Sequence, residues 1–227
     1  MTDRSLFSPV VVFLAASLSS QAATTITDDF SSYGSTLTTG DSTNPAVYSW
    51  AITNHVNSTT TIPITPDGAE LAGRFPGHTH PRNWTAEADI NITPQAQPTV
   101  STTNLTFSIV ERHEFTELDI LVAGNPTPEK FIFSGTGQVE LVFTQTGINE
   151  YLNGALQASR TYASVGWSPS DKVSSIKFIG LHHNNGSINR SYIDNISLVA
   201  IPEPGTTTIA SLALLGLSLR RRRAKHA

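Results

Sequence analysis

Residues 23–200 predict an all-β fold, a sandwich of two antiparallel sheets. Short runs of alternating apolar residues recur along this region, as at Val139, Leu141 and Phe143, and this period of two is typical of strands. Clusters of Gly, Asn, Pro and Ser separate the runs, and no stretch has a convincing helical period. Asn153-Gly154 lies between two such runs and predicts a type I′ hairpin, which requires positive φ at both positions.

About a dozen strands are expected. A first strand is predicted over Ile26–Phe30, and long loops are an alternative for the Thr-, Ser- and Asn-rich stretch from Ser31 to Thr65. The other strands are expected near residues 47–53, 69–75, 84–92, 105–110, 118–122, 131–133, 138–144, 148–152, 156–162, 173–179 and 192–199.

Composition narrows the possible functions of this region. It holds eight Lys and Arg against 16 Asp and Glu, so its net charge is near −8. An acidic body does not neutralise phosphates, which excludes nucleic acid as a partner. The chain has no cysteine, so its stability must come from an apolar core rather than from disulfides.

The N-terminus predicts export. Arg4 precedes an apolar stretch from Leu6 to Leu18, and small residues follow it up to Ala23. This order is typical of a signal peptide over residues 1–22, cleaved near Ala22.

The C-terminal segment, residues 201–227, has three parts in order. Pro202-Glu203-Pro204 cannot continue a strand or a helix, and an apolar run from Ile209 to Leu219 follows it. Four arginines then hold this end in the cytoplasm, because guanidinium groups cross a bilayer at high cost. They are Arg220, Arg221, Arg222 and Arg223. An ordinary membrane anchor is the alternative, but eleven apolar residues are fewer than the about 20 that a spanning helix needs.

These three parts resemble the PEP-CTERM signal of exported bacterial proteins. The resemblance implies that the partner is an exosortase, a membrane-embedded cysteine protease-transpeptidase. It also implies a C-terminal sorting helix that inserts in the membrane before processing. The destination it implies is the outer surface or the extracellular matrix of a Gram-negative cell.

A second resemblance concerns the body. The segment Tyr151-Leu152-Asn153-Gly154-Ala155-Leu156, followed about 40 residues later by the closing strand Tyr192–Leu198, is similar to concanavalin A-like or laminin G-like jelly rolls. The resemblance implies a two-sheet antiparallel jelly-roll sandwich whose last strand pairs with the first.

The closing strand carries a candidate metal ligand. If Ile196 and Leu198 face the core, the period of two also turns Asp194 inward, and an inward carboxylate needs a partner. Related carbohydrate-binding jelly rolls hold a structural calcium here, and this resemblance assigns Asp28, Asp29 and Asp194 as its ligands. The alternative is that Asp194 accepts hydrogen bonds from turn amides at the end of the sheet.

One strand carries a candidate catalytic pattern. Residues 114–121 resemble the Glu-x-Asp-x-x-Glu strand of laminarinase-type glycoside hydrolases, with Glu117 and Asp119 on one face. Val122 occupies the third carboxylate position, and without that acid nothing protonates the leaving group. We therefore expect no catalytic residue, and we interpret the acidic residues as solvated side chains.

Histidines and tryptophans supply the remaining candidates. His78 and His80 lie in a Pro- and Gly-containing loop without an identifiable third ligand for a metal. Trp50 and Trp84 fit strand patterns and are expected in the core. Exposed aromatics stack on sugar rings, so the candidate ligand-binding residues are those in loops: Trp167, His182 and Asn184.

The sequence therefore predicts an exported, exosortase-sorted protein of the cell surface or extracellular matrix. We expect it to be non-catalytic and to bind matrix polysaccharide, with calcium as its one expected cofactor. The alternatives are a glycoside hydrolase or lyase of the jelly-roll class, and a purely structural matrix component.

Overall fold

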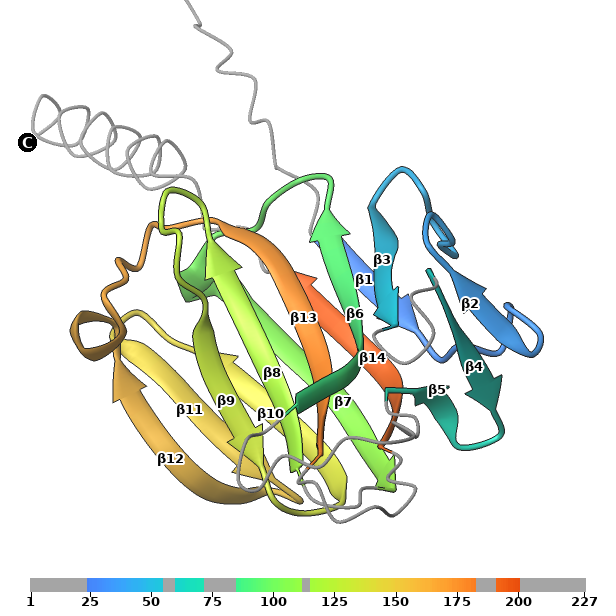
Figure 1. Cartoon of the computed structure of the whole chain (residues 1–227). Helices are drawn as coiled ribbons and strands as arrows, with labels where there is room; N and C mark the ends of the chain where they lie inside the picture. Colours follow the sequence, from blue (N-terminus) through green and yellow to red (C-terminus); the bar gives the residue numbers. More distant parts are fainter. Residues whose placement is uncertain (1–23, 55–59, 72–84, 112–114, 183–190, 201–227) are drawn as a thin grey trace, which may run out of the picture. The chain divides into compact units, whose positions relative to one another are not determined.

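The computed structural model describes residues 24–54, 60–71, 85–111, 115–182 and 191–200. Residues Ala23–Ile201 form one compact unit built of two antiparallel sheets (Figure 1). The fold is the all-β jelly-roll sandwich that the sequence predicts. In the described residues, no helix has the length and apolarity that crossing a membrane requires.

Fourteen strands are described. They are β1 (Thr24–Asp28), β2 (Thr36–Thr38), β3 (Tyr48–Asn54), β4 (Thr61–Thr65), β5 (Gly68–Glu70), β6 (Thr85–Pro94), β7 (Thr103–Glu111), β8 (Phe115–Val122), β9 (Glu129–Phe133), β10 (Gly137–Phe143), β11 (Gly147–Leu152), β12 (Ala155–Thr161), β13 (Val173–His182) and β14 (Tyr192–Ala200). Two short 3-10 turns, Val100–Thr102 and Tyr162–Val165, interrupt them.

The strands divide into a nine-stranded and a five-stranded sheet. The order in the larger sheet is β12-β11-β10-β7-β14-β5-β4-β2, with β1 also paired to β14. The order in the smaller sheet is β3-β6-β13-β8-β9. The apolar positions of both sheets face each other and form one continuous core. Phe107 of the larger sheet packs against Phe133 and Phe178 of the smaller one, at 5.8 and 5.0 Å between ring centroids.

The strand prediction is confirmed over most of the described chain. Asn153 and Gly154 have φ of 53° and 75°, as the predicted hairpin requires. β1 pairs with β14, which confirms the pairing of first and last strands. Within the stretch from Ser31 to Thr65, β3 confirms the strand predicted near residues 47–53, whereas β2 and β4 were not predicted. The alternation of buried and exposed residues is short in these two strands. The pairing of β2 with β4 places Leu37 opposite Ile62.

Strand β14 has a break in its alternation. Asn195 has φ of 52°, and the register with β7 shifts between Asp194 and Ser197. On one side of the bulge Tyr192 and Ile193 are both buried, and on the other Ile196 and Leu198 are. On the edge of β14 that faces away from β7, the partner strand also changes here. It is β1 at residues 196–200 and β5 at residues 192–193.

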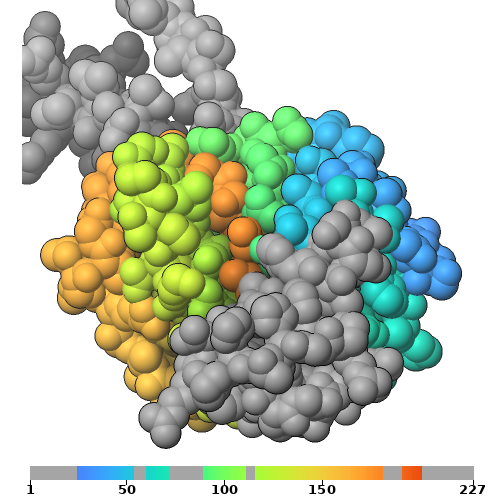
Figure 2. All heavy atoms as spheres, viewed as in Figure 1, coloured from blue at the N-terminus to red at the C-terminus, as the bar shows by residue number. Residues whose placement is uncertain are grey.

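Arg160 links the two sheets at one edge of the sandwich. The edge strands β9 and β12 both lie on the left of Figure 1, and their residues reach the surface there in Figure 2. Arg160 donates from Nε to Glu150 Oε1 at 2.5 Å, from Nη1 to the Lys130 carbonyl at 3.0 Å, and from Nη1 to Glu129. Its guanidinium also lies 4.6 Å from the ring centroid of Phe131. The buried Glu150 is therefore paired rather than isolated, which is the condition for burying a charge.

Candidate functional site

Asp28 is the centre of a buried hydrogen-bond cluster at the end of β1. Its Oδ2 accepts from the Tyr33 hydroxyl at 2.5 Å, the Tyr48 hydroxyl at 2.6 Å and Trp50 Nε1 at 2.9 Å. Its Oδ1 accepts from the Phe30 amide at 2.9 Å. Burial, reinforced by the Asp28 carboxylate, raises the pKa of Tyr33 and of Tyr48, so both hydroxyls keep the protons that they donate. We call Asp28, Tyr33, Tyr48 and Trp50 the Asp28 cluster.

This cluster engages both oxygens of Asp28. The sequence predicts Asp28 as a calcium ligand, but both of its oxygens already accept hydrogen bonds from the protein. Asp28 thus ties the first strand to β3 of the opposite sheet. Trp50 is 1% exposed, which confirms the prediction that it lies in the core.

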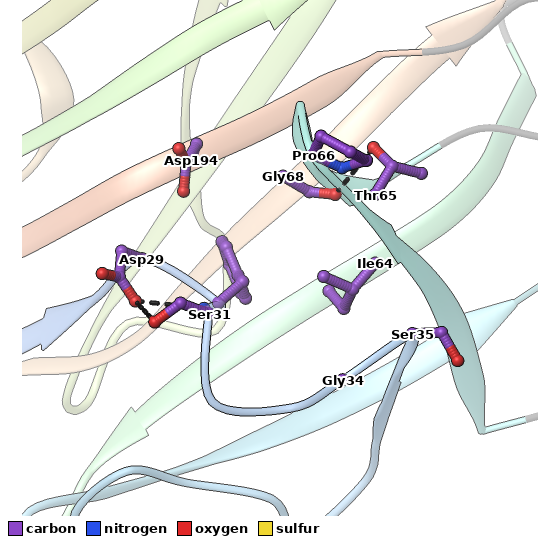
Figure 3. Close-up of a pocket in the computed structure, with 10 residues that line it drawn as sticks. Asp29, Ser31, Gly34, Ser35, Ile64, Thr65, Pro66, Gly68 and Asp194 are labelled. Carbon is purple, nitrogen blue, oxygen red and sulfur yellow. Dashed lines mark hydrogen bonds between the residues drawn. The ribbon is translucent and has the colours of Figure 1, made fainter.

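Asp29 and Asp194 line one cavity of about 350 Å³ beside this cluster. Figure 3 shows the two carboxylates on one side of the cavity, with Thr65, Pro66 and Gly68 on the other. Gly68 has φ of 110°, and a Cβ there would lie 2.2 Å from the carbonyl oxygen of Ile193. Only glycine therefore lets β5 approach β14 so closely at the cavity wall.

The period of two predicts that Asp194 points into the core, but it does not. The bulge at Asn195 interrupts the alternation, and Asp194 is half-buried at the cavity. Its Oδ2 accepts from the Asn195 side-chain amide at 2.9 Å. Burial raises the pKa of Asp194, the Asn195 backbone amide opposes this, and the charges of Asp29 and Asp28 add to the rise.

The residues present fit a calcium ion only in part. Across the described ranges, no group of three or more His, Asp, Glu or Cys residues could hold a metal. Asp194 Oδ1 is buried and accepts no hydrogen bond from the described chain, which leaves it open to a cation. Asp29 Oδ1 accepts from the Ser31 amide and hydroxyl, at 3.0 and 2.7 Å, and these bonds lower the pKa of Asp29.

The predicted aromatic ligand site is not formed at Trp167. This side chain is only 6% exposed and belongs to the core. Gly166, with φ of 69°, ends the preceding 3-10 turn, and the Trp167 amide donates back to the Tyr162 carbonyl at 2.9 Å. That turn directs the indole inward, so Trp167 offers no platform for a sugar ring. His182 ends β13, but its side chain lies outside the described part, as do Asn184, His78, His80 and Trp84.

The outer face of the five-stranded sheet carries an ordered set of polar residues. One register row across four strands contains Asn91, Lys177, Asp119 and Lys130. The next row contains Asp89, Ile179, Glu117 and Ile132. We call these eight residues the polar face. They alternate along their strands with core residues such as Leu118, Ile120 and Phe178, so they point away from the larger sheet.

Ion pairs organise the polar face. Lys130 Nζ lies 2.5 Å from Glu117 Oε1 and 3.8 Å from Asp119 Oδ1, and Lys177 Nζ lies 3.3 Å from Asp89 Oδ2. Glu117 and Asp119 are 6% and 9% exposed, so they are not the solvated residues that the sequence suggested. Burial raises the pKa of Asp119 to about 6, and the nearby Glu117 charge adds to the rise. The salt bridge to Glu117 raises the pKa of Lys130.

Two acceptor oxygens on this face accept no hydrogen bond from the residues that the structure describes. Asn91 Oδ1 is buried without a partner among these residues, whereas the buried Asp119 Oδ1 is ion-paired with Lys130. Both belong to the row of Lys177, one on each side of it. Sequence reasoning missed Asn91 and Lys177, because a single polar residue in a strand does not reveal its cross-strand neighbours.

The comparisons with known proteins identify the C-terminal segment. The model of the PEP-CTERM protein-sorting motif matches residues 200–223, as the sequence predicts. The motif indicates an exosortase-processed protein exported to the cell envelope or surface. A comparison with curated protein sequences found no match.

Solved structures resemble the body at low sequence identity. An apo Crh5 transglycosylase is 10% identical over 80% of this chain and 85% of its own, with a TM-score of 0.44. The family 7 alginate lyase A1-II′ is 10% identical over 70% of this chain and 96% of its own, with a TM-score of 0.42. The binding domain of botulinum neurotoxin DC is 11% identical over 73% of this chain and 48% of its own, with a TM-score of 0.42. The likeness concerns the fold alone, and no activity follows from it.

We predict that Asp28→Ala lowers the free energy of unfolding by about 2–4 kcal/mol, because it leaves buried donors of Tyr48 and Trp50 without their acceptor. Urea denaturation of residues 23–200, followed by tryptophan fluorescence, measures this loss. Asp67→Ala is the control, since this carboxylate lies in an exposed turn and should matter less. The loss at Asp28 should be equal in calcium and in chelator. A loss seen only with calcium would make Asp28 a metal ligand instead.

We also predict that Asp119 makes stability depend on pH between about 4 and 6. Its folded pKa lies above its ordinary value, so the folded state holds a proton that the unfolded state has released. Stability therefore falls as pH rises through this window. Asp119→Asn should flatten the fall and raise the melting temperature at pH 7. Asp67→Asn, in an exposed turn, is the control. A variant that melts lower at pH 7 would instead show that the charged Asp119 stabilises the fold through Lys130.

Proposed function

We propose that this chain is an exosortase-sorted protein of the cell surface or extracellular matrix, and that its sandwich binds neutral glycan without catalysis. The observation that carries the binding proposal is the row of Asn91, Lys177, Asp119 and Lys130, with its two acceptor oxygens that accept no hydrogen bond from the described residues.

Sorting is supported by the order of the chain. Strand β14 ends at Ala200, and the matched motif covers residues 200–223, so the signal follows the sandwich without a long linker. The short apolar run from Ile209 to Leu219 suits a segment that is removed after it has positioned the protein.

Glycan fits the polar face because a sugar hydroxyl both donates and accepts. Neighbouring hydroxyls could donate to Asn91 Oδ1 and Asp119 Oδ1, and accept from the ammonium groups of Lys177 and Lys130. Such contacts would give Asn91 Oδ1 the donor that it lacks, and a buried polar group without a partner costs about 1–3 kcal/mol.

The charge of the site favours a neutral glycan over an anionic one. Lys130 is paired with Glu117, and Lys177 with Asp89, so neither lysine presents an uncompensated positive charge. Asp119 adds a third carboxyl group to the two that the lysines neutralise. The net charge of residues 23–200, near −8, would further repel a polyanion.

The missing third carboxylate supports a non-catalytic face. Glu117 and Asp119 are two residues apart on one face of β8, and Val122 stands where the laminarinase-type pattern has its third acid. The next position on this face is Leu121, and Val122 is buried in the core.

A hydrolase is the second candidate, and one observation favours it. Asp89 and Glu117 lie in the same row on either side of Ile179. Two strand spacings separate them, about 9.6 Å, which is close to the upper limit for carboxylates of inverting glycosidases. Each is paired with a lysine, however, and a general acid needs a proton to give.

Calcium is a separate proposal, now restricted to Asp29 and Asp194. Calcium takes six to eight oxygen ligands, and these two carboxylates would supply only part of them. The support is the unpartnered Asp194 Oδ1 beside a second carboxylate in the same cavity.

For sorting, we predict that replacing Pro202, Glu203 and Pro204 together by alanine leaves the uncleaved protein in the membrane of a host with an exosortase. Immunoblots of membrane and surface fractions measure this. Replacement of Thr206, Thr207 and Thr208 by alanine is the control and should be processed normally. An unchanged mature C-terminus in the first variant would contradict the sorting proposal.

For the sandwich, we predict binding of a neutral glycan by residues 23–200 on a glycan array, without release of new reducing ends. Asn91→Ala and Lys177→Met should each weaken binding by roughly tenfold, since each removes about one hydrogen bond. Glu140→Gln on β10 of the other sheet is the control.

The same experiment separates the alternatives. Turnover of β-1,3- or β-1,4-linked glucans that is lost in Glu117→Gln would establish the hydrolase. Binding to no glycan would leave a structural matrix component.

For calcium, we predict that the melting temperatures with calcium and with chelator differ in the wild type and agree in Asp194→Ala. Equal melting temperatures in the wild type would exclude the calcium proposal.

A further inference from the structure

The peptide segment just before the sorting motif is part of the most enclosed region of the larger sheet. Ala200 pairs with Thr24 of β1 on one side and with Thr103 of β7 on the other. Leu198 likewise pairs with Ile26 and Leu105, and it is fully buried. Only Ile201 separates this strand from Pro202.

A protease binds its substrate as an extended segment on both sides of the bond it cleaves, because substrate backbone groups pair with the active-site cleft. Cleavage at Pro202-Glu203-Pro204 would therefore require several residues before Pro202 to leave the sheet. In the folded body these residues already pair with two strands, and the side chains of Leu198 and Ala200 are buried. They become available only when the end of β14 opens.

Strand β14 is also required to complete the sheet. In the described chain, β1 pairs only with β14, and β5, β4 and β2 join the rest of the sheet through β14. The strand that closes the sandwich is thus the one that the protease would have to withdraw. Docking of β14 and binding of its C-terminal end in a protease cleft exclude each other.

We propose that exosortase processing competes with folding, and that it acts on a state in which the C-terminal half of β14 is not docked between β1 and β7. This proposal rests on the proposed sorting by exosortase. Processing should then follow the population of the open state, because cleavage of a folded chain tracks transient opening when opening and closing are fast. The pairing of β1 with β14 controls how quickly the protein is released from its membrane-bound form.

The first test places a flexible linker between sandwich and motif in the full chain. An insertion of about six Gly and Ser residues between Ala200 and Ile201 supplies extended chain without opening β14. Pulse-chase labelling in a host with an exosortase measures the rate of conversion to the mature form. We expect the insertion to accelerate conversion at least about tenfold, which corresponds to removing a modest opening requirement.

The second test changes the opening equilibrium with matched substitutions. Ile26→Val in β1 removes one buried methylene next to Leu198, and Ile148→Val removes the same group in β11, which β10 and β7 separate from β14. Both isoleucines are 1% exposed, so the global cost should be similar. We expect Ile26→Val to accelerate processing by a few fold and Ile148→Val to leave it unchanged. In the linker background, Ile26→Val should have no effect.

The outcomes separate this inference from the sorting proposal. If the alanine variant of Pro202-Glu203-Pro204 is processed normally, sorting by this motif is wrong and the inference fails with it. If that variant is blocked but the linker leaves the rate unchanged, sorting stands and only the competition is wrong. Equal acceleration by Ile26→Val and Ile148→Val would mean that global unfolding, rather than opening of β14, permits cleavage.

Discussion

The position of β14 is the constraint on which the rest of the structure depends. This strand is the last one described in the chain, yet it lies inside the larger sheet, with β7 on one side and β1 and β5 on the other. The hydrogen bonds along its two edges can form only when the end of the chain is in place. The first and last strands are therefore neighbours, and long-range pairing of this kind forms late because loop closure costs entropy.

The bulge in β14 lets one strand serve two different neighbours. At Asn195 the alternation resets, and the partner changes from β1 to β5. Asp194 is thereby removed from the core and faces the cavity that it shares with Asp29. The irregularity and the candidate cation site thus have the same origin. A regular strand would have left a carboxylate against apolar side chains, at a cost of several kcal/mol.

Two polar clusters hold the sheets together beside the apolar core. The Asp28 cluster joins β1 to β3, and Arg160 joins β12 to β9. Each has partners for its buried charge or lone pairs, so neither carries the penalty of an isolated ion. The polar face differs, since Asn91 Oδ1 accepts no hydrogen bond from the described residues. This unsatisfied oxygen lies on the face where we propose that a ligand binds.

The sequence by itself determined the features that depend on local order along the chain. Export and sorting follow from consecutive residues, such as Pro202-Glu203-Pro204 ahead of an apolar run, and most strands follow from an alternation that neighbours impose on each other. The Asn153-Gly154 hairpin was predictable for the same reason, because the requirement for positive φ is a property of the two residues themselves.

Only the tertiary structure decided what distant residues do together. Asp28 accepts from Tyr48 and Trp50, about twenty residues away, and forms a buried cluster with them. Trp167 is buried although it follows a loop, and Asn91, Lys177 and Asp119 meet because three strands from different parts of the chain share one register. Pairing between strands fixes these neighbours, and a single strand's pattern specifies which face a residue takes but not which residue lies opposite.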